Sequence, residues 1–192
     1  MKYFILILLF PVFLYGQANK NIFVGNVMVQ WLDDGRSMKL QKQFGYIDQN
    51  GKLWNVPKNT VVDGASIPKA FWTIVGGPYE GKYRNASVVH DHYCVIKTET
   101  WQDVHKMFYN ACITGGTPVI KAKLMYSAVL AGGPRWEISI LKDRTGQKII
   151  VDKEANITAD EMKAVKEWIE TTNPSIEEIN ARMEGIVIET YK

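Results

Sequence analysis

The three histidines of the chain lie within sixteen residues of one another. His90 and His92 flank Asp91 in a His-Asp-His string, and His105 follows later in the chain. A neutral imidazole near its working pH acts as a general base or as a metal ligand, and a nearby carboxylate orients it or adds a ligand. These residue types predict a catalytic set of His90, Asp91 and His105. The same three residues are candidate ligands for a divalent metal, zinc or calcium.

A helical hairpin would bring two of these residues together. Residues 83–97 have apolar positions at helical spacing, and a second helix begins after Thr100, which is a good N-cap. His90 lies about as far before the intervening turn as His105 lies after it, so the two rings are expected within one bridging atom or water. Asp91 points about 100° away around its helix, and His92 points in a third direction, toward the surface. A buried polar network that orients the two helices is the alternative interpretation of this set.

A polar turn precedes the hairpin and supplies two more candidates. Asp63-Gly64-Ala65-Ser66 separates a short strand from a helix that begins at Pro68. Asp63 and Ser66 are predicted at the edge of the catalytic site. Turn and cap hydrogen bonds explain both residues equally well without any catalysis.

The two cysteines raise the question of a disulfide. Cys94 and Cys112 form an even count, which favours a disulfide in an exported protein. In the helical hairpin, however, they are offset by about 8 Å along the helix axis, beyond disulfide reach. We therefore expect two free, buried thiols. Cys94 lies one helical turn after His90 on the same face and is a further candidate metal ligand.

The elements around these residues predict an α+β fold. Strands rich in β-branched and aromatic residues form an antiparallel meander over residues 22–62, with a continuous strand at 22–32 and a hairpin turn at 48–51. Helices follow near 84–97, 101–114 and 118–131. The tail predicts a strand at 148–151, a helix from a capping box at Thr158, a helix with Asn173 as N-cap and Pro174 as first residue, and a strand at 186–191.

The chain divides into three parts by composition. Residues 1–18 contain a short apolar run after one Lys, which predicts a signal peptide and an exported protein, periplasmic or secreted, with no stable membrane anchor after cleavage. Residues 19–140 form the α+β domain. Residues 141–192 carry 8 Lys or Arg and 11 Asp or Glu, and form an acidic helical appendage packed on that domain. The net charge of +3 for the whole chain gives no reason to expect a nucleic-acid partner.

Several separated motifs resemble one known family. These motifs are VPKNTVVDGASIPKAFW, the ASVVHDHYC helix, VHKMFYNA and YSAVLAGGPRW. Together they resemble the bacterial and phage domain-of-unknown-function family 1353, over about residues 22–136. The resemblance supports the fold and the position of the site, and it implies no reaction. The chain departs from the family pattern at His105, where many members carry Asp.

Three functions from different classes fit these observations. The first is an exported hydrolase that uses the His/Asp/His set as a general base or with a metal. The second is a non-catalytic envelope- or phage-derived binding module, in which the polar cluster is structural. The third is an inhibitor or immunity-type protein that acts on a secreted partner through its acidic tail.

Overall fold

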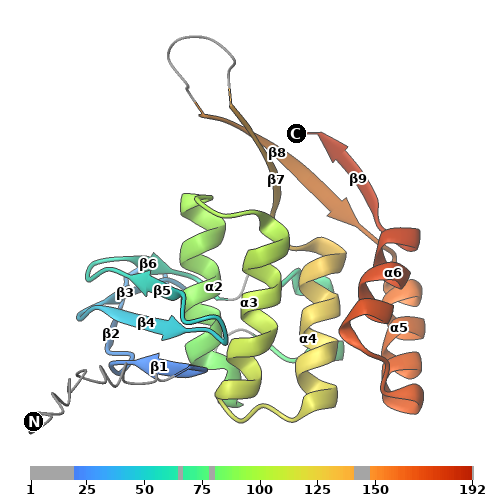
Figure 1. Ribbon diagram of the computed structural model, residues 1–192, viewed down its shortest axis with the longest axis horizontal. Coiled ribbons are helices and arrows are strands. Elements are labelled where there is room, and N and C mark those ends of the chain that lie inside the picture. Colours follow the sequence, from blue (N-terminus) through green and yellow to red (C-terminus); the bar gives the residue numbers. More distant parts are fainter. Residues whose placement is uncertain (1–19, 65–66, 78–80, 141–147, 192) are drawn as a thin grey trace, which may run out of the picture.

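The computed structural model describes residues 20–64, 67–77, 81–140 and 148–191. The predicted signal peptide and Ser66 lie outside the described residues. The described chain confirms an α+β fold, with strands first, a helical cluster next and a mixed C-terminal part (Figure 1). In this part of the chain, no helix has both the length and the apolar composition needed to cross a membrane.

The N-terminal strands form two small antiparallel sheets. One sheet has the order β1-β4-β5 and the other the order β2-β3-β6. The turn at 48–51 joins β4 to β5 as predicted, and Tyr46 pairs with Trp54 across it. The bounds are β1 Ile22–Val24, β2 Val29–Trp31, β3 Met38–Leu40, β4 Phe44–Ile47, β5 Leu53–Val56 and β6 Val61–Val62.

The prediction of one continuous strand at 22–32 is wrong. The chain leaves β1 at Gly25, where φ is +81°, and re-enters extended structure only at β2. A positive φ is accessible to glycine at little cost and is incompatible with a regular strand. The segment therefore supplies one strand to each of the two sheets.

The central helices agree closely with the sequence prediction. Thr100 caps α3, its side chain accepting a hydrogen bond from the Asp103 amide. Nearly every side of α4 is buried, which matches its apolar composition on all faces. The bounds are η1 Lys69–Phe71, α1 Trp72–Val75, η2 Gly81–Tyr83, α2 Arg84–Ile96, α3 Trp101–Thr114 and α4 Val119–Gly132.

The C-terminal part adds a third antiparallel sheet, of order β7-β8-β9, and two helices. Strand β7 ends at Ile140, where the predicted domain boundary lies, and it pairs with β8 on the other side of that boundary. This sheet therefore joins residues of both predicted parts. The expected cap at Asn173 is wrong: Asn173 ends α5 with a left-handed φ of 47°, and Ser175 caps α6. The bounds are β7 Arg135–Ile140, β8 Lys148–Asn156, α5 Ala159–Thr172, α6 Ile176–Ile186 and β9 Ile188–Tyr191.

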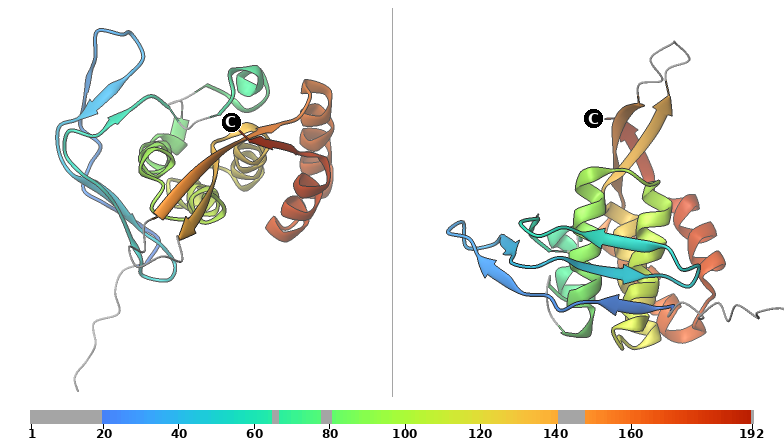
Figure 2. Two further views of the ribbon diagram at one scale, coloured as in Figure 1. Left: turned by 90° about the horizontal axis from the view of Figure 1, so that it is seen from above. Right: turned by 60° about the vertical axis from the view of Figure 1, so that its left-hand side comes forward.

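The elements pack in layers around the helices. The N-terminal sheets cover one side of α2 and α3. Helix α4 lies on the side of α3 away from these sheets and contacts α5 and α6 (Figure 1). Seen from above, the third sheet crosses over one end of the helices (Figure 2). Hydrogen bonds from Lys123 Nζ to Asn173 Oδ1 (2.6 Å) and from Tyr126 to Asn180 (2.7 Å) hold the C-terminal helices to α4.

Candidate functional site

The hairpin of α2 and α3 brings two histidine rings into direct contact. His90 Nε2 lies 2.9 Å from His105 Nδ1, a hydrogen-bonding distance, and the ring centroids are 5.0 Å apart. Both side chains have no solvent-exposed surface. Phe108 packs against the His90 ring and Trp101 against the His105 ring, with centroids 4.7 and 5.5 Å apart. The structure therefore places the two rings as the hairpin geometry predicts, and places them in the interior.

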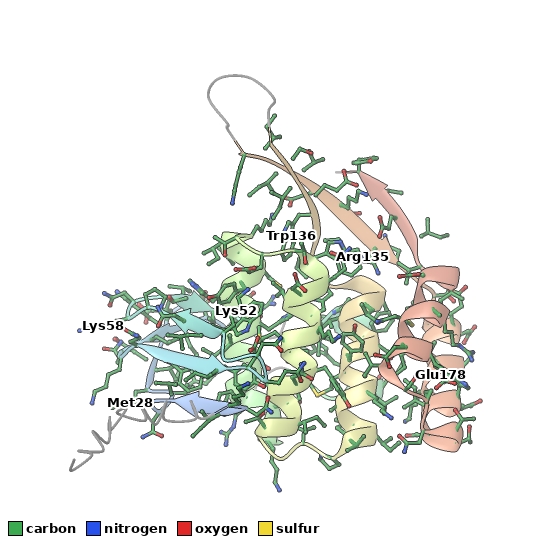
Figure 3. All side chains as sticks on the ribbon, in the orientation of Figure 1. Met28, Lys52, Lys58, Arg135, Trp136 and Glu178 are labelled. Atoms are coloured by element: carbon green, nitrogen blue, oxygen red, sulfur yellow. The ribbon has the colours of Figure 1, made fainter. Side chains whose placement is uncertain are left out.

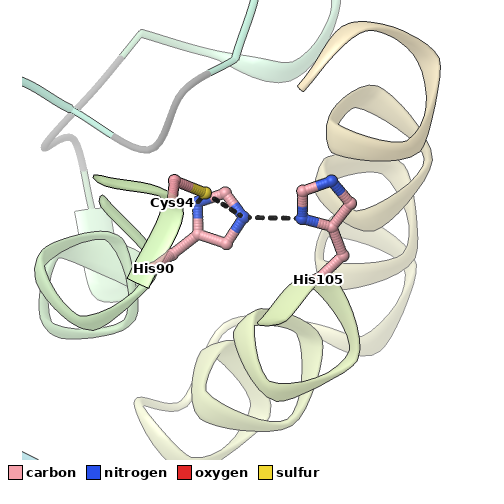
Figure 4. Close-up of side chains that lie close together, drawn as sticks. All are labelled: His90, Cys94 and His105. Atoms are coloured by element: carbon pink, nitrogen blue, oxygen red, sulfur yellow. Dashed lines mark hydrogen bonds between the residues drawn. The ribbon is translucent and has the colours of Figure 1, made fainter. Parts of the chain in front are cut away.

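Cys94 is the third member of this cluster (Figure 4). Its Sγ lies 3.6 Å from His90 Nε2 and 3.8 Å from His90 Nδ1. The spacing of four residues places both side chains on the same face of α2. The ligand atoms of His90, Cys94 and His105 all lie within 4.8 Å of one another. We refer to these three residues as the His-Cys-His cluster.

The predicted third ligand, Asp91, is not part of the cluster. It is 4% exposed, and its Oδ2 accepts a hydrogen bond of 2.6 Å from the Gly64 amide. Asp91 thus ties α2 to the turn that precedes the helices, because its position next to His90 aims it at a different neighbour. Among the described residues, Cys94 takes the place in the cluster that the sequence prediction assigned to Asp91.

The other sequence candidates have different surroundings. Asp63 is half exposed and forms an ion pair with Arg36 Nη2 at 2.9 Å. Ser66 lies outside the described residues. The prediction that His92 lies at the surface is wrong: it is 9% exposed, its ring meets the edge of Tyr93, and burial lowers its pKa. Neither Cys94 nor Cys112 forms a disulfide, and both side chains are buried, as predicted.

His105 is held as a neutral ring. Burial lowers its pKa well below the ordinary value of 6.5, and the neighbouring His90 and Arg135 lower it further. Its Nε2 has no hydrogen-bond partner among the described residues. Arg135 stacks over Trp101 at 4.2 Å, at the start of β7 near the ends of α3 and α4 (Figure 3). A positive guanidinium so close adds to the cost of a second positive charge on His105.

A surface pocket of about 870 Å³ lies beside the cluster. It forms where the C-terminal ends of α2 and α4 meet η1, β8 and the start of β7. Cys94 lines this pocket, whereas His90 and His105 do not. Asp63, a predicted edge residue, also lines it. The cluster therefore meets the pocket through the thiol.

Cationic side chains outnumber anionic ones among the residues that line this pocket. The cations are Arg36, Lys69, Lys97, Arg135 and Lys153, and the anions are Asp63, Asp152 and Glu154. Two ion pairs, Arg36–Asp63 and Lys97–Asp152, lie within this lining. Arg135 also pairs with Glu189, and Lys153 with Glu137 and Glu189, so ion pairs engage most of the cations around the pocket.

The fold and the site define this protein as an α+β protein with a buried His-Cys-His cluster between two helices, beside a surface pocket. Residues 38–129 match the model of the family described as Protein of unknown function (DUF1353). This match confirms the resemblance found in the motifs over that segment of the chain. The segment includes all three cluster residues and ends within α4.

Two relatives from Sinorhizobium fredii are similar to this chain. The uncharacterized protein y4jT is 49% identical over 100 residues, which cover 52% of this chain and 30% of that protein. The uncharacterized protein y4iH is 42% identical over 125 residues, which cover 64% of this chain and 52% of that protein. The chain thus spans about half or less of the length of these relatives. No solved structure matches.

Proposed function

We propose that the protein is an exported hydrolase in which Cys94 is the nucleophile and His90 its general base. The observation that carries this proposal is the position of Cys94, which lines the pocket while its sulfur contacts the His90 ring. A nucleophile beside a base, with that base held by a third group, is the arrangement that activates thiols for acyl transfer.

One choice of His90 tautomer gives the proton a path from the thiol to the ring. With His90 as the Nε2–H tautomer, Nε2 donates to His105 Nδ1 and His90 Nδ1 accepts from the Cys94 thiol, 3.8 Å away. His90 takes the thiol proton, and the thiolate attacks a carbonyl carbon in the pocket. The leaving group takes that proton from His90 as its bond to carbon breaks, and water then hydrolyses the acyl thioester.

Contact with the Cys94 sulfur distinguishes the roles of the two histidines in this proposal. Neither ring has exposed surface, so His90 exchanges protons with the thiol and the leaving group only at the Cys94 sulfur, and His105 meets no substrate. His90 acts on the thiol, and His105 is a positioning residue that fixes the tautomer and orientation of His90.

A non-catalytic binding module is the second candidate. The observation that favours it is the complete burial of His90 and His105 with a hydrogen bond between them. A buried pair of this kind can serve only to join α2 to α3. In that case Cys94 would be an ordinary buried thiol at the pocket wall.

Acylation by an activated ester separates the two candidates. The protein is incubated with p-nitrophenyl acetate in the presence of a chelator, and intact mass and peptide mapping locate the acetyl group. We expect one acetyl group on Cys94, no labelling of that peptide in Cys94→Ser, and normal labelling in the matched control Cys112→Ser. Acetylation of Cys94 no faster than that of a free cysteine peptide at the same pH would refute the hydrolase.

Two histidine variants test the assigned roles. His90→Gln should lower the acylation rate by about a hundredfold or more, the usual contribution of general-base catalysis. His105→Gln should lower it less and shift the pH profile of acylation, because the ring that orients His90 is replaced. Thermal melting of each variant separates loss of folding from loss of chemistry.

A further inference from the structure

We propose that the His-Cys-His cluster binds one Zn²⁺ ion through His90 Nε2, Cys94 Sγ and His105 Nδ1, and that the bound ion blocks the Cys94 nucleophile. The inference rests on the proposed function for its consequence, the loss of thiol reactivity. The metal site itself stands on the geometry and chemistry of the three donors.

The donor spacing is close to that of a tetrahedral zinc site. Zinc bonds of 2.0–2.1 Å to nitrogen and 2.3 Å to sulfur at tetrahedral angles separate donors by about 3.3 Å for two nitrogens and about 3.6 Å for nitrogen and sulfur. Cys94 Sγ already lies 3.6 Å from His90 Nε2. The two nitrogens lie 2.9 Å apart, so the rings must separate by about 0.4 Å. The sulfur also lies 3.8 Å from His90 Nδ1, and the three donors lie within 4.8 Å of one another, so the Cys94 side chain must rotate toward His105 as well.

The donor types select the metal. Two imidazoles and one thiolate suit zinc, whereas calcium requires several oxygen ligands. The carboxylate of Asp91, the nearest oxygen ligand in sequence, is held by the Gly64 amide. Burial of all three donors excludes competing water, and the pocket beside Cys94 provides a route of entry and room for a fourth ligand.

Binding releases one proton. The Cys94 thiol loses its proton to solvent, and the sulfur lone pair forms the bond to zinc. The proton between the two rings moves to His90 Nδ1, which frees His90 Nε2 to donate its lone pair. His105 coordinates through Nδ1 and carries its proton on Nε2, the nitrogen that has no partner among the described residues.

Zinc binding therefore controls the reactivity of Cys94. A sulfur lone pair shared with zinc is a weaker nucleophile, and in the zinc-bound protein His90 Nδ1, which takes the thiol proton in the metal-free form, already carries a proton. The metal-free protein is therefore the reactive form, and zinc at a concentration above its Kd suppresses acylation.

Cobalt provides a direct test on the unaltered protein. Co²⁺ is added to the metal-free protein, and the near-ultraviolet absorbance is recorded. We expect a thiolate-to-cobalt charge-transfer band that saturates at one ion per chain and disappears when Zn²⁺ is added. Absence of this band, or its saturation at several ions per chain, overturns the metal site without using any variant.

Variants and a protection assay complete the test. Cys94→Ser should abolish the charge-transfer band, and His105→Gln should weaken Zn²⁺ binding by at least about tenfold, while the matched controls Cys112→Ser and His92→Gln should bind normally. Zn²⁺ should slow alkylation of Cys94 by iodoacetamide, and a chelator should restore the rate. Zinc bound at the cluster with unchanged alkylation refutes the block.

The two proposals fail in distinguishable ways. Acylation of Cys94 is measured with chelator and no metal, so failure there refutes the hydrolase and leaves the cobalt spectrum unaffected. Conversely, rapid acylation together with no cobalt band refutes the metal site and leaves the hydrolase in place.

Discussion

Lowering the pH should destabilise the fold through His105. Burial, His90 and Arg135 together hold its pKa well below 6.5 in the native state, whereas the unfolded chain titrates near 6.5. Below pH 6.5 the unfolded state therefore binds a proton that the native state excludes. Stability is fully present above that pH and is lost as the pH falls, until the native ring also becomes protonated.

The magnitude follows from this linkage. A group that is protonated only in the unfolded state changes the free energy of unfolding by up to about 1.4 kcal/mol per pH unit. Between pH 7.5 and 5.0 the loss from His105 is about 2 kcal/mol, provided that the ring stays neutral in the fold. This is a large fraction of the stability of an ordinary domain.

Urea unfolding at a series of pH values measures this effect. The titrations are run on the wild-type protein and on His105→Gln, with a chelator present so that metal binding does not contribute. Gln does not ionise, so the variant should lose about 2 kcal/mol less than the wild type over the same pH range. Equal losses in the two proteins, or a wild type that gains stability on acidification, would refute the reasoning.

Three other predictions concern packing and thiol chemistry. Asp48 is buried and accepts hydrogen bonds from the Asn50 and Lys52 amides and from Trp54 Nε1, so Asp48→Ala should cost about 1–3 kcal/mol in urea unfolding, and more than Asp34→Ala in an exposed turn. Lys123→Met should cost about 1 kcal/mol of stability and lower the thermal midpoint, because it removes the hydrogen bond to Asn173. The matched variant at an exposed position, Lys163→Met, should leave the midpoint unchanged. Burial raises the pKa of Cys112, so this thiol should resist an aromatic disulfide reagent at pH 8 in the native protein and react fully in denaturant.

The sequence was most informative about local structure. The bounds of α2, α3 and α4 agree with their predicted ranges within one or two residues, because caps, glycines and apolar periodicity act over a few neighbouring positions. The predicted meeting of His90 and His105 needed only a helical hairpin with a short turn. Local prediction failed at 22–32, where a glycine at positive φ redirected the chain, and at Asn173, which ends α5 and does not cap α6.

Surroundings were harder to predict than elements. His92 was expected at the surface because it faces away from His90 on its helix. The helix alone sets the direction in which the His92 side chain points, but its burial depends on which other element lies in that direction. Helix α2 packs against both N-terminal sheets as well as α3. Every residue from Ala86 to Cys94 is consequently buried.

The sequence by itself determined the α+β class, the helical hairpin and the pairing of His90 with His105, since all three follow from short-range patterns. Only the tertiary structure decided that Cys94, and not Asp91, completes the cluster. A helix sets the angle between neighbouring side chains, whereas the turn at Gly64 and the pocket come from segments distant in sequence. In the folded protein the Gly64 amide binds the Asp91 carboxylate, and the elements around the pocket place the Cys94 thiol at its wall.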